Sequence, residues 1–243
     1  MINILVPIAG KSIFFENSQY VFPKPLIEID GVPMIEHVIA NLNTIQSPKK
    51  FTFVLSNSDC SRFHLDSVVQ LLAPGCEIVR LDGETKGAVC SALMAIEQVN
   101  HPQELVIVNA DQIIHSELDT ILEDFRKQAL DAGVLCFDSV HPRWSFVRVD
   151  EEGQILEAAE KRPLSRHAIA GFYYFRSGED FVRAAMNSIR KDANVNGTYY
   201  IAPVLNELVL ENKRLGMLEI PKQSYDTFYS PQKIEEYERR QRT

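Results

Sequence analysis

Residues 104–111 read ELVIVNAD, a mainly apolar run that ends abruptly in polar residues. A continuous apolar run of this length is typical of a strand buried on both faces of a parallel sheet. Residues 3–6 (NILV) and 51–56 (FTFVLS) have the same character, and residues 77–81 add a further strand. Because helical stretches separate these runs, the first 140 residues predict an α/β fold, a doubly wound and mostly parallel sheet with helices on both faces.

Stretches with helical periodicity lie between the strands. In residues 34–42, the apolar side chains recur on one stripe, as expected for an amphipathic helix. Other helices are expected at residues 63–72, 86–99, 118–129, 179–190 and 202–210, and from Pro231 onward. The second half also predicts a hairpin over residues 145–160, with strands at residues 134–137, 168–175 and 217–220. No linker-like stretch divides the chain, so we expect one domain over residues 1–243.

The charge balance excludes several classes of partner. The 243 residues include 33 acidic and 25 basic side chains, for a net charge of −8. Such an acidic chain is a poor candidate for binding nucleic acid or an anionic membrane surface. Its apolar runs are too short to span a membrane, its first ten residues do not have the pattern of a secretory leader, and its four cysteines are far apart. We therefore expect a cytoplasmic protein without disulfides or a zinc site.

Three loops should carry the chemistry, because ligands of an open parallel sheet bind beyond the carboxyl ends of its strands. These loops are residues 8–22, 82–87 and 109–112. Just beyond the first loop, Lys24 lies between two prolines, which fix an extended backbone; it is a candidate phosphate ligand or, equally, a solvated lysine in a turn. Asp111 ends a buried strand, where a carboxylate either caps a helix or binds Mg²⁺. Trp144 is expected either to stack on a ligand or to pack in the core.

Six motifs, in order along the chain, resemble those of the nucleotidyltransferases that make activated sugars, with phosphocholine-type cytidylyltransferases as close relatives. They are AG(x12)PKPLIEIDGVPMIEHVI, TKGAVCSAL, LVIVNADQ, AAEKRP followed by AGFYYF, NGTYY, and YDTFYSPQKIEEY. Together they cover nearly the whole chain. The resemblance implies a Rossmann-like nucleotide-diphospho-sugar transferase (GT-A-like) fold, with a nucleotide-binding half over residues 1–140 and a substrate-side half over residues 141–243.

The same resemblance implies an activity. It is the Mg²⁺-dependent transfer of a nucleoside monophosphate from a nucleoside triphosphate to a phosphorylated sugar or similar small phosphate, with release of pyrophosphate. The implied pathway is the synthesis of surface polysaccharide precursors, and a homo-oligomer is left open. The protein supplies no nucleophile in such a reaction, because it positions two polyanions and neutralises the charge that spreads between them.

Roles for individual residues follow from the resemblance by matching motifs. The implied catalytic residues are Lys24, at the α-phosphate, Lys161 and Asp111. The implied metal ligands are Asp111 and Asp226. The implied nucleotide-binding residues are Ala9, Gly10, Lys11, Thr85, Gly87, Ala88 and Asn109. The implied residues of the second substrate's wall are Glu160, Lys161, Gly171, Asn196 and Tyr199.

The first loop departs from the family pattern AG-x-G-[ST]-R-[LF]. Ser12 stands where the pattern has its second glycine, and Phe14 stands where it has an arginine. Glycine lets the backbone approach a triphosphate, and arginine clamps phosphates with a planar fork. Three interpretations remain open at this point: Lys11 replaces the arginine in an active enzyme, the chain is a glycosyltransferase of related fold, or it is an inactive protein that binds nucleotide sugars.

Overall fold

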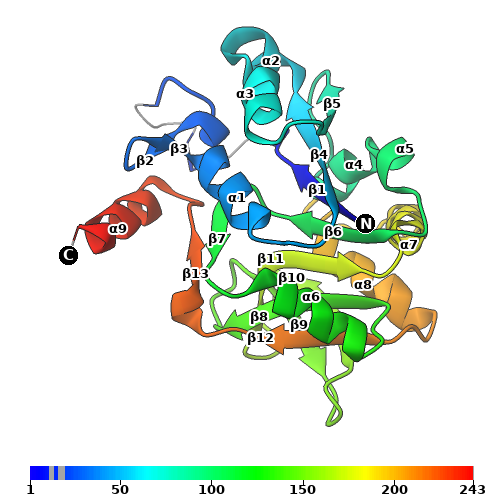
Figure 1. Cartoon of the computed structure of the whole chain (residues 1–243). Helices are drawn as coiled ribbons and strands as arrows, with labels where there is room; N and C mark the ends of the chain where they lie inside the picture. The colour runs from blue at the N-terminus through cyan, green and yellow to red at the C-terminus, as the bar shows by residue number, and fades with distance from the viewer. Residues whose placement is uncertain (11–13, 16–19, 243) are drawn as a thin grey trace.

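The computed structural model describes residues 1–10, 14–15 and 20–242 (Figure 1). The parallel part of its main sheet is centred on β1 (Ile2–Pro7), which pairs with β4 (Lys49–Ser56) on one side and with β6 (Glu104–Val108) on the other. β5 (Glu77–Leu81) extends this parallel part beyond β4. The apolar runs that predicted buried strands therefore form the parallel part of the sheet, as expected.

The rest of the chain, from residue 132 on, continues the same sheet with mainly antiparallel pairings. β11 (His167–Phe175) is antiparallel to β6 and joins the two halves of the chain edge to edge. Beyond it lies the hairpin of β9 (Ser145–Val149) and β10 (Ile155–Glu160). β8 (Ala132–Asp138) also pairs antiparallel with β11, and β12 (Leu215–Glu219) pairs in parallel with β8. The described residues thus form one mixed sheet of nine strands.

Helices cover both faces of this sheet, as the alternation of strands and helices predicts. One buried apolar cluster joins the sheet to the helices α1 (Met34–Asn43), α2 (Asn57–Phe63), α3 (Leu65–Leu72) and α6 (Leu118–Lys127). A second cluster joins the other face to α4 (Ala88–Leu93), α5 (Ile96–Val99), α7 (Gly178–Arg190) and α8 (Ile201–Leu210). Both clusters draw residues from both halves of the chain.

Two expected helices are interrupted. The helix expected over residues 63–72 begins at Leu65, because His64 adopts the left-handed conformation (φ 54°) that separates α2 from α3. The helix expected over residues 86–99 begins at Ala88 and breaks at Ala95, where φ and ψ leave the helical region, to give α4 and α5. Helical periodicity continues through both breaks, which is why it does not reveal them.

Short elements at the strand ends complete the fold. Lys24 begins a 3₁₀ turn, η1 (Lys24–Leu26), which leads into the small hairpin of β2 (Glu28–Ile29) and β3 (Val32–Pro33). β7 (Gln112–Ile114) pairs with β13 (Tyr225–Thr227), which follows a second 3₁₀ turn, η2 (Lys222–Ser224). The last helix, α9 (Pro231–Gln241), packs near β2 (Figure 1). These pairings bring the end of the chain to the loop that carries Lys24.

No helix in the part of the chain that the structure describes is both long and apolar enough to cross a membrane.

Candidate active site

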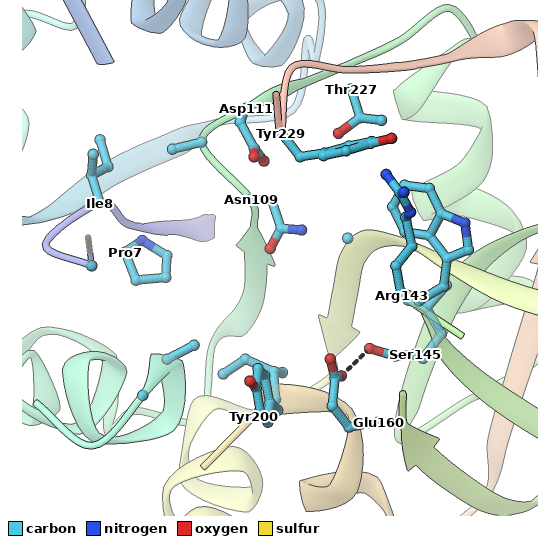
Figure 2. Close-up of a pocket in the computed structure, with 18 of the residues that line it drawn as sticks. Pro7, Ile8, Asn109, Asp111, Arg143, Ser145, Glu160, Tyr200, Thr227 and Tyr229 are labelled. Carbon is cyan, nitrogen blue, oxygen red and sulfur yellow. Dashed lines mark hydrogen bonds between the residues drawn. The ribbon is translucent and has the colours of Figure 1, made fainter. Parts of the chain in front are cut away.

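A cavity of about 640 Å³ lies beyond the carboxyl ends of β1 and β6, where the sheet topology predicts a ligand site (Figure 2). Its walls come from both halves of the chain: the β1 loop, the segment after β6, the strands β9 to β11, and the segment around β13. A second cavity of about 610 Å³ lies toward β4 and β5 and shares Ile8, Gly10, Lys24 and Pro25 with the first. Lys24 therefore lies at the junction of the two cavities.

Lys24 and Asp111 meet in this cleft. The Lys24 ammonium donates to the Asp111 carboxylate, and the two side chains are only 20% and 22% exposed. Pro23 and Pro25 set the backbone around Lys24, and the segment that follows β6 leaves the sheet at Asp111. Two of the three residues expected to be catalytic are therefore in direct contact.

The first loop places Gly10 in both cavities and Ala9 in the second. Lys11 and Ser12 lie outside the described residues. Phe14, at the position of the family's arginine, lines the first cavity and packs edge-on against Tyr229, with 5.7 Å between ring centroids. At the position where the family pattern has an arginine guanidinium, this chain therefore has an aromatic ring in contact with another.

The loop before α4 approaches the opposite wall closely. Gly87 has φ 116°, and a β-carbon there would lie 2.5 Å from the Tyr199 carbonyl oxygen, so only glycine fits. Gly87 and Ala88, which the resemblance assigns to the nucleotide, line the first cavity. Thr85 lines neither cavity. Its hydroxyl forms hydrogen bonds with the Gly87 carbonyl and the Ser91 hydroxyl, which fix the loop before α4 from the side away from the cavity.

Asn109, expected at the nucleotide, and Gly171, expected at the second substrate, both line the floor of the cleft. The backbone N–H of Asn109 donates to the Gly171 carbonyl (3.0 Å), and the side-chain amide of the buried Gln112 donates to the same oxygen (3.0 Å). Gly171 has φ +60°, and a β-carbon there would collide with the Asn109 and Gln112 side chains. Gln112, which the sequence did not single out, therefore holds the floor in place.

Glu160 lies on the far wall, where the Ser145 hydroxyl donates to its carboxylate (Figure 2). Burial raises the pKa of Glu160 above its ordinary value, although the Ser145 hydrogen bond and the charge of Lys161 oppose this. Lys161 lies outside the residues that line the cavity; its ammonium donates to the Tyr200 hydroxyl (2.7 Å). Lys161 thus flanks the cleft through Tyr200 and makes no contact with Lys24 or Asp111.

The NGTYY segment contributes different residues from those expected. Thr198 and Tyr200 line the cavity, whereas Asn196 lies in a turn with φ 52° and the Tyr199 hydroxyl donates to Asp192 (2.6 Å). Alternation explains the place of Tyr199, because neighbours in an extended segment point to opposite sides. Asn196 lies outside the lining because the chain turns there before the extended segment begins. In the structure, Thr198 and Tyr200 line the cavity in place of Asn196 and Tyr199.

Asp226 lies beside the cavity rather than in its lining. It follows Tyr225 and precedes Thr227 in β13, and these two neighbours line the cavity while Asp226 does not. Its carboxylate lies 2.9 Å from the His115 Nε2 atom and accepts a hydrogen bond from Arg240. The expectation that Asp111 and Asp226 hold a metal together therefore stays a prediction.

Several lining residues were not assigned to the site from the sequence. Arg143 lies over the Tyr229 ring, with 4.1 Å from the guanidinium carbon to the ring centroid, and Trp144 packs edge-on against the same ring at 6.0 Å. Trp144 thus both packs and lines the cavity, the two roles left open for it. Arg143 and Tyr229 lie in irregular segments. The one sequence signal that could have indicated them is that each lies close to one of the six motifs in the chain.

Comparison with known proteins shows the family. The model of the MobA-like NTP transferase domain matches residues 5–172, well over half of the chain. The chain belongs to this family. Among curated proteins, this MobA-like NTP transferase domain is 24% identical over 213 residues to the bifunctional protein GlmU of Oenococcus oeni, which is 84% of this chain but 45% of GlmU. The chain therefore spans less than half the length of that relative.

Two further matches span most of both chains. The UTP–glucose-1-phosphate uridylyltransferase AglF of Haloferax volcanii is 22% identical over 223 residues, 90% of this chain and 87% of AglF. The crystal structure of the nucleoside-diphosphate-sugar pyrophosphorylase from Vibrio cholerae RC9 superposes with a TM-score of 0.83 at 24% identity, covering 97% of this chain and 99% of that one. The structural likeness confirms the expected fold of this MobA-like NTP transferase domain.

Proposed function

We propose that the chain transfers a nucleoside monophosphate from a nucleoside triphosphate to a phosphorylated sugar or similar small phosphate, releasing pyrophosphate. The observation that carries this proposal is the contact of Lys24 with Asp111 in the first cavity, whose walls also carry Gly87 and Ala88 on one side and Glu160 on the other. The family and the names of GlmU and AglF support the same class of reaction. Supply of a precursor for surface polysaccharide is part of the proposal and rests on the family resemblance alone.

In the proposed reaction, an oxygen of the acceptor's phosphate forms a bond to the α-phosphorus in line with the leaving group. The bond between the α-phosphorus and the bridging oxygen to the β-phosphate breaks, and its electron pair leaves with pyrophosphate. Lys24 moves its hydrogen bonds from Asp111 to the α-phosphate and stabilises the charge that develops there. Gly87 and Ala88, which line the cavity where α4 begins, are the residues proposed to contact the nucleotide.

The opposite wall binds the acceptor. Glu160 accepts hydrogen bonds from the acceptor's hydroxyl groups, and Ser145 holds the carboxylate in place. Arg143 binds anionic oxygen, because its guanidinium is fixed on the Tyr229 ring and has no carboxylate partner in the described part of the chain. Lys161 and Tyr200 add a second cationic group at the rim. These positive charges are local, so the acidic net charge of the protein does not prevent binding of two anions.

Mg²⁺ is proposed as the cofactor. Mg²⁺ binds through one or two carboxylates and keeps waters and substrate phosphates as its other ligands. The Asp111 carboxylate and the Thr227 hydroxyl, which face the cleft together (Figure 2), fit this requirement as oxygen donors. When bound, the ion would neutralise charge on the triphosphate.

Pyrophosphate release tests the proposal. The protein is incubated with Mg²⁺, each of the four nucleoside triphosphates, and a panel of sugar 1-phosphates and phosphocholine. We expect pyrophosphate only when a triphosphate and an acceptor are both present, together with the corresponding nucleoside-diphosphate product. A nucleotide sugar that binds without turnover in either direction would instead show an inactive binding protein, and transfer of a sugar from a nucleotide sugar would show a glycosyltransferase.

A further inference from the structure

An aromatic wall with one charged residue lines the cavity beside β13. Tyr229 packs edge-on against Phe14, with 5.7 Å between ring centroids, and against Trp144 at 6.0 Å. Trp144 also packs against Tyr225 at 6.1 Å, and all four rings line the cavity. The Arg143 guanidinium lies over the Tyr229 ring, 4.1 Å from its centroid (Figure 2). The wall therefore combines four aromatic rings with one positive charge.

The aromatic wall is fastened to the segment that carries Asp111. The Phe228 amide donates to the Asp111 carbonyl (2.7 Å), and Tyr229 is the next residue in the chain. At its other end, the wall continues into Ser145, whose hydroxyl donates to Glu160. The wall thus connects the reacting end of the cleft, at Asp111, with the part that is proposed to bind the acceptor, at Glu160.

Arg143 brings a positive charge to this wall that no described carboxylate neutralises. Its Nε atom donates to the His141 Nδ1 atom (3.3 Å), and its guanidinium forms no ion pair with the described residues. Asp111 and Glu160, the acidic side chains among the described lining residues, have other partners. A guanidinium that lies over a ring keeps the N–H groups at its edge for hydrogen bonds, so this one can bind an anion without leaving the ring.

Without Arg143, the same wall has the composition of a site for an organic cation. Tyrosine and tryptophan rings attract positive charge to their faces, and groups of such rings bind quaternary ammonium ligands. In this protein, one face of Tyr229 is already occupied by the chain's own cation. A second cation beside it meets a like charge at close range in a partly buried cleft, where water screens the repulsion incompletely.

We infer that Arg143 selects the acceptor by its charge: the acceptor presents anionic oxygen to the aromatic wall, and an acceptor with a quaternary ammonium group, such as phosphocholine, is disfavoured. That the ligand of this wall is the acceptor rests on the proposed function. The motifs are compatible with two acceptor classes, sugar phosphates and phosphocholine-type compounds, and the wall fits the first. Arg143 is thus a specificity-determining residue.

Two phosphate esters of the same shape test the inference. Phosphocholine and neohexyl phosphate differ only in the central atom of the bulky head group, a charged nitrogen in the first and a neutral carbon in the second. Their Kd values are measured from the fluorescence of Trp144, the single tryptophan of the chain and a member of the wall. We expect the wild-type protein to bind neohexyl phosphate about tenfold or more tightly than phosphocholine, because only phosphocholine places a cation beside Arg143.

Arg143→Met removes the charge and keeps a side chain of similar reach. It should remove the preference for neohexyl phosphate or reverse it, since the Tyr229 face is then free for the ammonium group. It should also weaken binding of glucose 1-phosphate by about tenfold, the loss expected when one charged hydrogen-bond donor is removed. Arg143→Lys keeps the charge and should keep the preference.

Arg62→Met is the matched control. Arg62 also lies over an aromatic ring, that of Phe63 (5.2 Å), but it lines neither cavity, so its loss should leave all three Kd values unchanged. Circular dichroism establishes that each variant is folded. The inference is overturned if the wild-type protein binds phosphocholine as tightly as neohexyl phosphate, if folded Arg143→Met keeps the wild-type preference, or if Trp144 responds to none of the three ligands.

These outcomes do not depend on catalysis. A protein that releases pyrophosphate with phosphocholine as its preferred acceptor refutes the charge selection by Arg143 and leaves the proposed function standing. A protein that shows the expected Kd values but no nucleotidyl transfer with any substrate pair refutes the proposed function instead.

Discussion

Loss of the Lys24 ammonium should have a large effect on turnover. Lys24→Ala is expected to lower kcat by about 100-fold or more, the usual loss when one group that stabilises developing charge is removed. Pyrophosphate release at saturating substrates measures the effect. Lys50→Ala is the matched control, because its ammonium pairs with Glu77, which lies outside both cavities. A Lys24→Ala protein with a wild-type rate would contradict the role given to Lys24.

Acceptor binding should depend on the ionisation of Glu160. Its pKa is raised by burial, so it loses its proton at a higher pH than an exposed glutamate, whose pKa is about 4.3. As pH rises through this raised value, Glu160 becomes a carboxylate that accepts hydrogen bonds, and the KM for the acceptor should fall. The KM is measured between pH 4.5 and 8.

Glu160→Gln should abolish this change in KM, because the amide does not titrate. The KM for the nucleoside triphosphate serves as an internal reference, since Glu160 lies on the acceptor wall. If both KM values change with pH in parallel, or if the change persists in Glu160→Gln, another group is responsible.

At the scale of single residues, the sequence identifies those whose chemistry is fixed by their neighbours in the chain. Two prolines around Lys24 and an apolar run before Asp111 are visible without a structure, and both residues lie in the cleft. Arg143 and Tyr229 could not be assigned in this way. They reach the cleft only because the loop after β8 and the segment after β13 meet there, which is a property of the tertiary fold.

At the scale of elements, Gly171 offers a prediction about β11. Gly171→Ala is expected to lower the free energy of unfolding by several kcal/mol, because it combines a positive φ with a collision against Asn109 and Gln112. Gly153→Ala is the control: its φ is +80° but nothing lies near its added β-carbon, so it should cost only about 1 kcal/mol. Urea denaturation measures both. Equal losses would show that crowding at the cleft floor contributes nothing.

The strands also show where element-scale prediction fails. Apolar runs predict β1, β4 and β6 well, because a strand that is buried on both faces is made almost entirely of apolar residues. The three-residue strands β7 and β13 have no such pattern, and the residues of β13 that line the cavity are Tyr225 and Thr227, not Asp226. A motif match identifies the segment correctly, but which of its residues line the cavity follows from the tertiary fold.

At the scale of the whole molecule, the two halves share one sheet and its two main apolar clusters. β11 from the second half pairs with β6 from the first, and both main apolar clusters contain residues of each half. A third cluster ties α9 to the hairpin of β2 and β3 and to Met34 at the start of α1. The cleft is therefore built by the packing of the whole chain, and the one-domain organisation is still a prediction to be tested.

Unfolding in urea provides that test. Trp144 is the single tryptophan of the chain, and it packs against Phe137, Tyr225 and Tyr229, so its fluorescence reports on the cleft and on the docking of the last segment. Far-UV circular dichroism reports on the helices of both halves. If the chain is one cooperative domain, the two transitions should have the same midpoint and the same slope. Trp144→Phe, followed by circular dichroism alone, is the control for stability. A fluorescence midpoint clearly below the circular dichroism midpoint would show that the substrate side opens separately, and the cleft would then be an interface between two domains.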